Sequence, residues 1–148
     1  MIFLSYHNQD LKIVIQIYSE LLKTVDEELW FAPEQIRFGQ DWKEEVKYGI
    51  ESSNSIILFS NFNKEIAQRS LNFIEEERMI RMSLKNHPDK RVALVNFKKS
   101  NTPYERLRVN KQFNLRNEIN ENQILNLKNS PVFASLVTFL NLPNRRIN

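Results

Sequence analysis

The sequence predicts a single α/β domain built on a parallel β-sheet. Apolar residues alternate along the chain between short strand-like runs and stretches with helical spacing, which is typical of this class. The run at 55–60 is apolar almost throughout, as in central parallel strands that helices cover on both faces. A length of 148 residues, with 41% hydrophobic and 26% charged residues, suits one domain with one core.

The first two strands are predicted at 2–6 and at 28–31. Apolar residues at helical spacing between them predict an amphipathic helix over 10–23. A loop containing Pro33 and Gly39 follows the second strand. The chain has only two glycines, so one in this loop indicates a demand of the backbone.

The second helix is predicted to begin at Asp41, which can cap it, with Glu44 completing a capping box. Its inner stripe is Trp42, Val46, Gly49 and Ile50. After the strand at 55–60, a loop over 61–69 leads to a helix over 70–85, and Pro88 lies beyond its end.

The fourth strand is predicted at 91–97, and 112–115 is a weak edge strand. Ser130 and Pro131 form an N-cap and first-turn pair for a last helix. That helix is expected to bury Phe133, Leu136, Val137 and Leu140. We expect one domain over 1–143 and a frayed tail over 144–148.

Five strands alternating with helices suggest a flavodoxin-like sheet of order 2-1-3-4-5. Ligands of such sheets bind beyond the carboxyl ends of the strands, at the switch point between the first and third strands. The residues after Tyr6, the loop up to Trp42 and the residues after Phe59 are expected to converge there.

Composition excludes several classes of site. The absence of cysteine rules out disulfides and suits a reducing cytoplasm, and with only two histidines a structural zinc site is very unlikely. No glycine-rich phosphate loop, signal peptide or membrane-spanning run is found. The net charge is +3, and the basic cluster is read as a solvated face rather than a nucleic-acid surface. That cluster comprises Lys98, Lys99, Arg106, Arg108, Lys111 and Arg116.

Glu77 is the leading candidate for a functional side chain. On a helical wheel of ~100° per residue it shares a narrow stripe with Phe73, Ile80 and Leu84, whereas Glu75 and Glu76 are expected to point elsewhere. A carboxylate on a core-facing row is costly unless it is paired or lies at a cleft. The alternatives are a buried ion pair with an arginine or lysine and a position at the rim of the core.

Other candidates have equally plausible structural roles. His7 follows the first strand, where it can face a ligand or cap the next element. Trp42 can offer its ring to a base or belong to the core. Ser5, His7 and Asp10 are too close in sequence to form a hydrolase triad.

Four blocks of the sequence, in order, resemble the TIR (Toll/interleukin-1 receptor) domain family, most closely its bacterial members. They are the strand Ile-Phe-Leu-Ser-Tyr ending at Tyr6, the loop from Phe31 to Trp42, the block from Ile50 to Ser60, and Phe73-x-x-x-Glu77. The last is similar to a W-x-x-x-E motif with Phe73 in place of tryptophan. Ala32 stands where many relatives have an aspartate.

The resemblance implies an enzyme that cleaves NAD⁺ at the nicotinamide–ribose bond, with Glu77 as its catalytic carboxylate. It implies no cofactor and no metal, and NAD⁺ is the substrate. The expected product is ADP-ribose or a cyclic isomer. The substrate-binding residues expected from the resemblance are His7, Tyr6, Arg37, Gly39, Trp42, Phe73 and Ser60.

The resemblance also implies activation by oligomerisation with other TIR domains, as an effector in bacterial anti-phage defence. A fused or separate sensor is the expected partner, without nucleic acid or membrane, in the cytoplasm. One alternative is a non-catalytic module that docks other TIR domains through the loop from Phe31 to Gln40. A nucleoside-processing fold such as a deoxyribosyltransferase fits the loop poorly.

Overall fold

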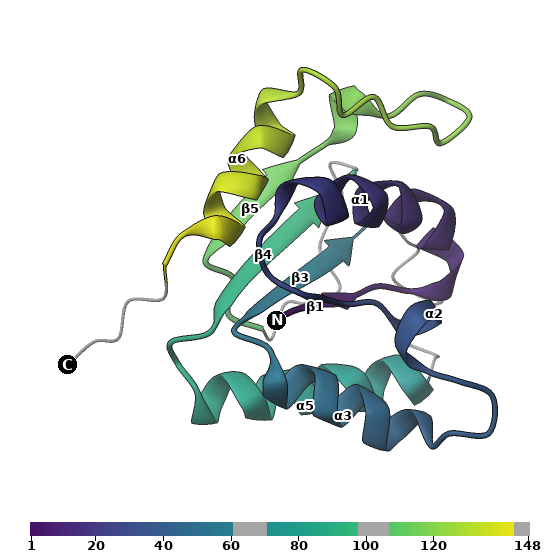
Figure 1. Ribbon diagram of the computed structural model, residues 1–148, viewed down its shortest axis with the longest axis vertical. Helices are drawn as coiled ribbons and strands as arrows, with labels where there is room; N and C mark the ends of the chain where they lie inside the picture. Colours follow the sequence, from purple (N-terminus) through teal and green to yellow (C-terminus); the bar gives the residue numbers. More distant parts are fainter. Residues whose placement is uncertain (61–70, 98–106, 144–148) are drawn as a thin grey trace.

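A five-stranded parallel sheet forms the centre of the protein (Figure 1). The structure is a computed structural model that describes residues 1–60, 71–97 and 107–143. Its strand order is β2-β1-β3-β4-β5, which confirms the predicted order and the parallel pairing. The strands are β1 (Ile2–Ser5), β2 (Leu29–Trp30), β3 (Ser55–Ser60), β4 (Arg91–Asn96) and β5 (Lys111–Asn114).

The longer helices agree with the predicted positions, and three short elements in the described residues are additional. The longer helices are α1 (Leu11–Thr24), α3 (Trp42–Ser52), α5 (Leu71–Asn86) and α6 (Pro131–Asn141). A 3₁₀ turn, η1 (Asn8–Asp10), precedes α1, and another, η2 (Arg116–Glu118), follows β5. The predicted loop after β2 contains a helical turn, α2 (Ala32–Gln35), because Pro33 suits the first turn of a helix.

Several predicted features lie outside the described residues. They are the loop over 61–69, the helix start at Ser70, the basic residues Lys98, Lys99 and Arg106, and the tail over 144–148. The predicted N-caps Asp41 and Ser130 are confirmed, but among the described residues no hydrogen bond of Glu44 is found that would complete the capping box. Asp41 accepts a hydrogen bond from the Lys43 amide at 3.0 Å, and Ser130 accepts one from the Phe133 amide at 3.1 Å.

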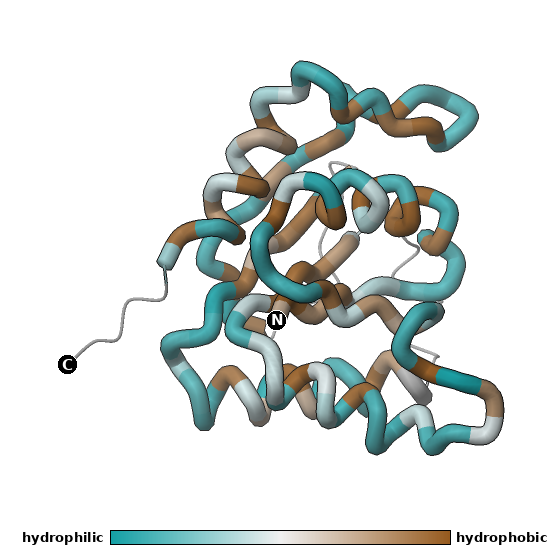
Figure 2. The backbone as a smooth tube through the Cα atoms, in the orientation of Figure 1, coloured by the Kyte–Doolittle hydropathy of each residue, from teal (hydrophilic) through white to brown (hydrophobic). Residues whose placement is uncertain are grey.

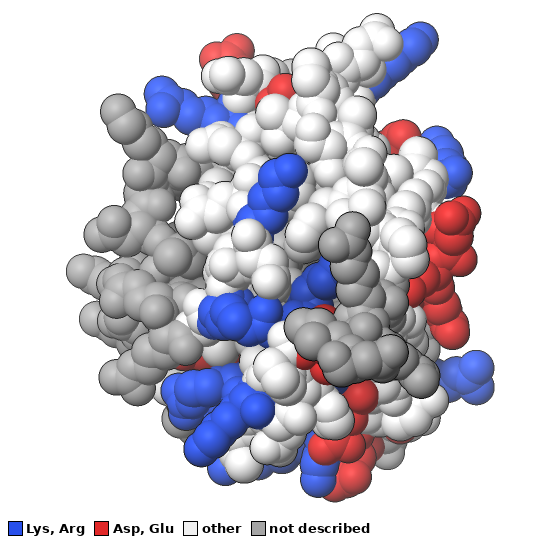
Figure 3. Space-filling view, turned by 90° about the vertical axis from the view of Figure 1, so that its left-hand side faces the viewer, with Lys and Arg blue, Asp and Glu red and all other residues white. Residues whose placement is uncertain are grey.

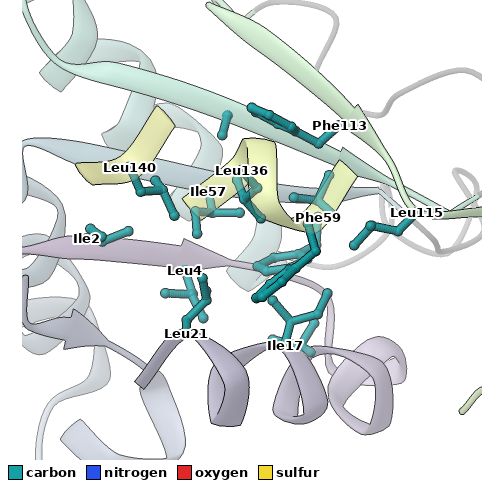
Figure 4. Close-up of a cluster of buried hydrophobic side chains, with 14 of the residues drawn as sticks. Ile2, Leu4, Ile17, Leu21, Ile57, Phe59, Phe113, Leu115, Leu136 and Leu140 are labelled. Carbon is teal, nitrogen blue, oxygen red and sulfur yellow. The ribbon is translucent and has the colours of Figure 1, made fainter. Parts of the chain in front are cut away.

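Each face of the sheet is covered by two helices (Figure 1). Helices α1 and α6 pack on one face, where they meet the odd-numbered residues of β3 and the even-numbered residues of β1 (Figure 4). Helices α3 and α5 cover the opposite face, which β1 and β3 line with Phe3, Ile56 and Leu58. In Figure 2 the strands and inner helix surfaces are hydrophobic, and the connections are mostly hydrophilic.

The two glycines serve different purposes. Gly39 has φ +86°, a conformation that residues with a side chain rarely adopt, so the predicted backbone demand is confirmed. Gly49 lies on the buried side of α3, where a Cβ atom would come within 2.6 Å of the Trp30 indole. The missing side chain therefore lets α3 lie directly on the ring, which also stacks on Phe3 at 4.7 Å.

Lys90 connects the two helices of this layer. It is 6% exposed, and its ammonium group donates to the Ile50 carbonyl at 2.8 Å and to the Ser83 hydroxyl at 2.7 Å. A third hydrogen bond goes to the Glu51 carbonyl at 3.2 Å. These bonds cap the last turn of α3 and attach it to α5. Burial lowers the pKa of Lys90.

Replacing Gly49 with alanine is expected to destabilise the protein by roughly 1–3 kcal/mol, because the added methyl group overlaps the Trp30 ring. Urea denaturation followed by tryptophan fluorescence measures this. Gly39→Ala is the matched control: its Cβ meets no atom within 4 Å, so its cost is limited to backbone strain of about 1 kcal/mol. Equal midpoints for Gly49→Ala and the wild type would show that the ring has room to move.

Candidate functional site at the carboxyl edge of the sheet

Polar residues replace the apolar ones where β1, β3 and β4 end on the α5 side of the sheet. Alternate residues of a strand share a face, so Ser5 continues the row of Phe3, Ser60 continues that of Leu58, and Asn96 continues that of Leu94. Ser5 and Ser60 are buried, and Asn96 is half-buried. The apolar α5 face of the sheet therefore ends in a polar margin at the edge where parallel sheets bind ligands.

Glu76 of α5 lies against this margin. The Ser5 hydroxyl donates a hydrogen bond of 2.7 Å to Glu76 Oε1, joining residues 71 positions apart in the sequence. The Glu76 residue as a whole is half-buried, whereas protein atoms closely surround its carboxyl group. Burial raises the pKa of Glu76 from 4.5 to about 7, and the hydrogen bond from Ser5 opposes part of this rise.

The expectation that Glu76 points away from the sheet is therefore wrong. The buried residues of α5 include Ser83 as well as Phe73, Ile80 and Leu84. On a wheel of ~100° per residue, Ser83 widens the buried arc toward Glu76, and Glu77 falls at its opposite border. A wheel drawn from apolar residues alone misses this, because Ser83 is buried by its bond to Lys90 rather than by hydrophobicity.

Glu77 lies beside Glu76 on α5 and is half-buried. Among the described residues, no hydrogen bond or ion pair of its carboxylate is found, so neither a buried ion pair nor a contact with the polar margin is seen there. Its catalytic role stays a prediction. Glu75 pairs with Arg78 at 3.2 Å on the outer side of the helix.

Three of the predicted site residues, His7, Phe73 and Tyr6, lie near Glu76. The His7 ring lies 6.4 Å from the Phe73 ring, one turn of α5 before Glu76. His7 also caps η1, accepting from the Gln9 amide at 3.3 Å, and burial lowers its pKa. Burial and the charge of Glu76 raise the pKa of Tyr6, so the phenol and this carboxylate are electrostatically coupled.

The predicted site residues Arg37 and Gly39 belong to a turn of their own in the loop after β2. Arg37 and Gly39 are exposed in a turn that two hydrogen bonds close: Gln40 amide to Arg37 carbonyl at 3.1 Å, and Arg37 amide to Gln40 Oε1 at 2.6 Å. Trp42 is half-buried and packs against the α3–α5 side of the core, as expected if it belongs to the core. Among the described residues, no hydrogen bond or ring contact connects this turn to Glu76.

Asn96 and Gln112 extend the polar margin beyond the predicted set. The Ser60 hydroxyl donates to Asn96 Oδ1, and Asn96 Nδ2 donates to Gln112 Oε1 at 3.4 Å. The signal that identifies Asn96 is present in the sequence, because an amide ends the apolar row of Val92 and Leu94.

A groove of about 410 Å³ between α3 and α5 lies away from this margin. It is lined by residues in the later turns of both helices, including Ile50, Glu51 and Met82. These turns lead into β3 and β4, so the groove lies toward the amino ends of the strands.

In the part of the chain that the structure describes, no group of three or more acidic, histidine or cysteine side chains is arranged to hold a metal ion.

Charges of both signs occupy the surface. Figure 3 shows Lys and Arg at several places on one face, separated by uncharged side chains, with acidic side chains along the lower and right borders. Of the basic cluster identified in the sequence, Arg108, Lys111 and Arg116 are exposed.

None of the helices in the described ranges combines the length and the apolar composition needed to cross a bilayer.

The parallel sheet and its order define an α/β domain, and the polar margin lies at the carboxyl edge of the strands, where sheets of this kind bind ligands. The sequence matches the family model of the TIR domain over residues 2–127. The chain therefore belongs to the TIR domain family. A comparison with curated proteins finds no match.

The buried carboxyl group of Glu76 makes stability depend on pH. Its folded-state pKa lies above the ordinary value, so the folded protein holds the proton more tightly. The contribution of Glu76 to the stability of the fold is fully present below pH 4.5 and is lost as the pH rises through about 7.

Glu76→Gln, which stays neutral, is therefore expected to gain stability relative to the wild type between pH 4 and pH 8, by up to about 3 kcal/mol. Urea unfolding at both pH values measures the difference. Glu77→Gln is the neighbouring control and is expected to show a much smaller pH-dependent change. The same pH dependence for both variants would contradict the burial of Glu76.

Proposed function

We propose that this TIR domain cleaves NAD⁺ at the nicotinamide–ribose bond and that Glu76 is the carboxylate that acts on the substrate. The observation that supports the proposal is the Glu76 carboxyl group held by Ser5 at the carboxyl edge of the sheet. Its position on α5 is one residue before the glutamate expected from the resemblance. Phe73 precedes Glu76 by three residues instead of four, so the proposed assignment departs from the spacing of the motif.

The chemistry needs a fixed negative charge. When the bond between nicotinamide and C1′ breaks, the electron pair leaves with the base, and the ribose becomes an oxocarbenium-like cation. A carboxylate beside C1′ stabilises this cation, and its protein surroundings strengthen the interaction relative to water. Water then adds to C1′ and releases a proton, which gives ADP-ribose; attack by a ring nitrogen of the same molecule gives a cyclic isomer.

The raised pKa of Glu76 suits this role. The carboxyl group is partly protonated near pH 7 in the free protein. A nicotinamide cation bound next to it favours the ionised form, because an opposite charge lowers the pKa of a carboxyl group. The substrate thus helps to create the charge that its transition state needs, and the energetic cost of burying that charge is offset when the substrate is bound.

Assembly with further TIR domains is part of the proposal. The resemblance to TIR domains implies that they act together with further copies. Contacts with a second domain that fix the surroundings of Glu76 would raise the activity. The role of an effector in bacterial anti-phage defence, with a fused or separate sensor, rests on the resemblance alone.

Glu76→Gln is expected to lower the rate of nicotinamide release by at least about 100-fold, because it removes the charge and keeps the shape. The rate is measured from NAD⁺ with the protein concentrated, in crowding agent or tethered to beads. The wild-type kcat/KM, which reports groups of the free protein, is expected to rise with pH through about 7 as Glu76 loses its proton.

Glu77→Gln is the comparison that decides between the two glutamates. If Glu76 acts on the substrate, the Glu77 variant keeps most of the wild-type rate. Loss of activity in the Glu77 variant alone would restore the assignment that the resemblance implies. If the wild type releases no nicotinamide under any assembly condition, the enzymatic proposal fails.

A non-catalytic docking role is the second candidate, and the turn before α3 favours it. Phe38 is fully exposed there, at 108% of its reference area, next to the positive φ of Gly39. A large aromatic side chain on a hydrogen-bonded turn is a preorganised anchor for another protein.

Phe38→Ala is expected to weaken self-association by about tenfold, or roughly 1.4 kcal/mol, without lowering stability. Analytical ultracentrifugation of the concentrated protein measures the association. Tyr48→Ala serves as the control, since Tyr48 is also exposed but lies on α3 outside the turn. If the Phe38 variant associates like the wild type, the turn is not the anchor.

A further inference from the structure

We propose that Ser5 is the positioning residue of this site: its hydroxyl fixes Glu76 Oε1 and favours the ionised carboxylate. The inference rests on the proposed function, in which Glu76 acts on the substrate. The hydrogen bond is 2.7 Å long and joins a buried strand residue to a helix residue far away in the sequence. Hydroxyl-to-carboxylate bonds of this length are strong and directional.

The backbone at Ser5 is well fixed. Strand β1 lies between β2 and β3, and Ser5 pairs in register with Leu58 of β3. Ser5 is 1% exposed, and it occupies the α5 face where the preceding residue of that row is Phe3. A residue of ordinary strand character at this position would be apolar, so the hydroxyl is a specific departure from the pattern of the face.

The hydroxyl affects the charge as well as the orientation. Burial opposes the ionisation of Glu76, and its neighbours along α5, Glu75 and Glu77, are also acidic. Tyr6 lies within electrostatic reach, and the His7 ring lies near Phe73. Among the described residues, Ser5 is the hydrogen-bond donor found for this carboxylate, so it counteracts the cost of burial.

Removing the hydroxyl is expected to raise the titration midpoint of Glu76 by roughly one pH unit, a tenfold change in its acid dissociation. The midpoint is measured by ¹³C NMR of the side-chain carboxyl group in Ser5→Ala and in the wild type. The signal is assigned by its disappearance in Glu76→Gln. The titration of His7 is followed through its own ring signals.

A second pair of variants separates the hydroxyl from the volume of the side chain. Ser5→Thr and Ser5→Val have nearly the same shape, and only threonine keeps the donor. We expect threonine to hold the midpoint near that of the wild type and valine to shift it as alanine does. Ser135→Ala, on the exposed side of α6, is the control for a serine replacement elsewhere.

The pH dependence of nicotinamide release gives the functional readout. The rising part of the profile is expected to move upward by the same pH unit in Ser5→Ala and Ser5→Val, with Ser5→Thr close to the wild type. Unchanged midpoints in the alanine and valine variants would overturn the inference even if NAD⁺ is cleaved. Shifted midpoints without NAD⁺ cleavage by any protein would support the tuning by Ser5 and refute the proposed function.

Discussion

The hydrogen bond between Ser5 and Glu76 is the interaction on which the site depends. It attaches the first strand to the helix after the third, and it places a carboxyl group where the apolar interior ends. Burial near the sheet disfavours the charge, and the hydroxyl favours it. The result is a carboxyl group that is poised near neutral pH, which is a common feature of functional sites.

The layer formed by α3 and α5 supports this arrangement. Gly49 lets α3 lie close to the Trp30 ring, and Lys90 attaches the end of α3 to α5 through Ser83. The first contact joins α3 to the sheet, and the second joins α3 to α5. Glu76 and Ser83 lie on the same side of α5, so this side bonds to Ser5 near one end of the helix and to Lys90 near the other.

The stability of the fold and its proposed activity make opposite demands on Glu76. A neutral side chain would suit the partly buried position better above pH 7, whereas the stabilisation of a ribose cation needs the charge. Such a conflict is typical of residues that are retained for function rather than for folding. Glu75 differs in its partner, since it pairs with Arg78 of the same helix rather than with the sheet.

The sequence alone determined the α/β class, the strand order, the helix caps at Asp41 and Ser130, and the special conformation of Gly39, because each depends on local pattern or on general topological rules. It located the site only as far as the carboxyl edge and one helix. Tertiary structure decided which of Glu76 and Glu77 contacts Ser5. The buried side of α5 includes Ser83, which bonds to Lys90, and the apolar pattern alone does not contain this residue. The contact with Ser5 likewise links residues 71 positions apart, and no local rule specifies a hydrogen bond over that separation.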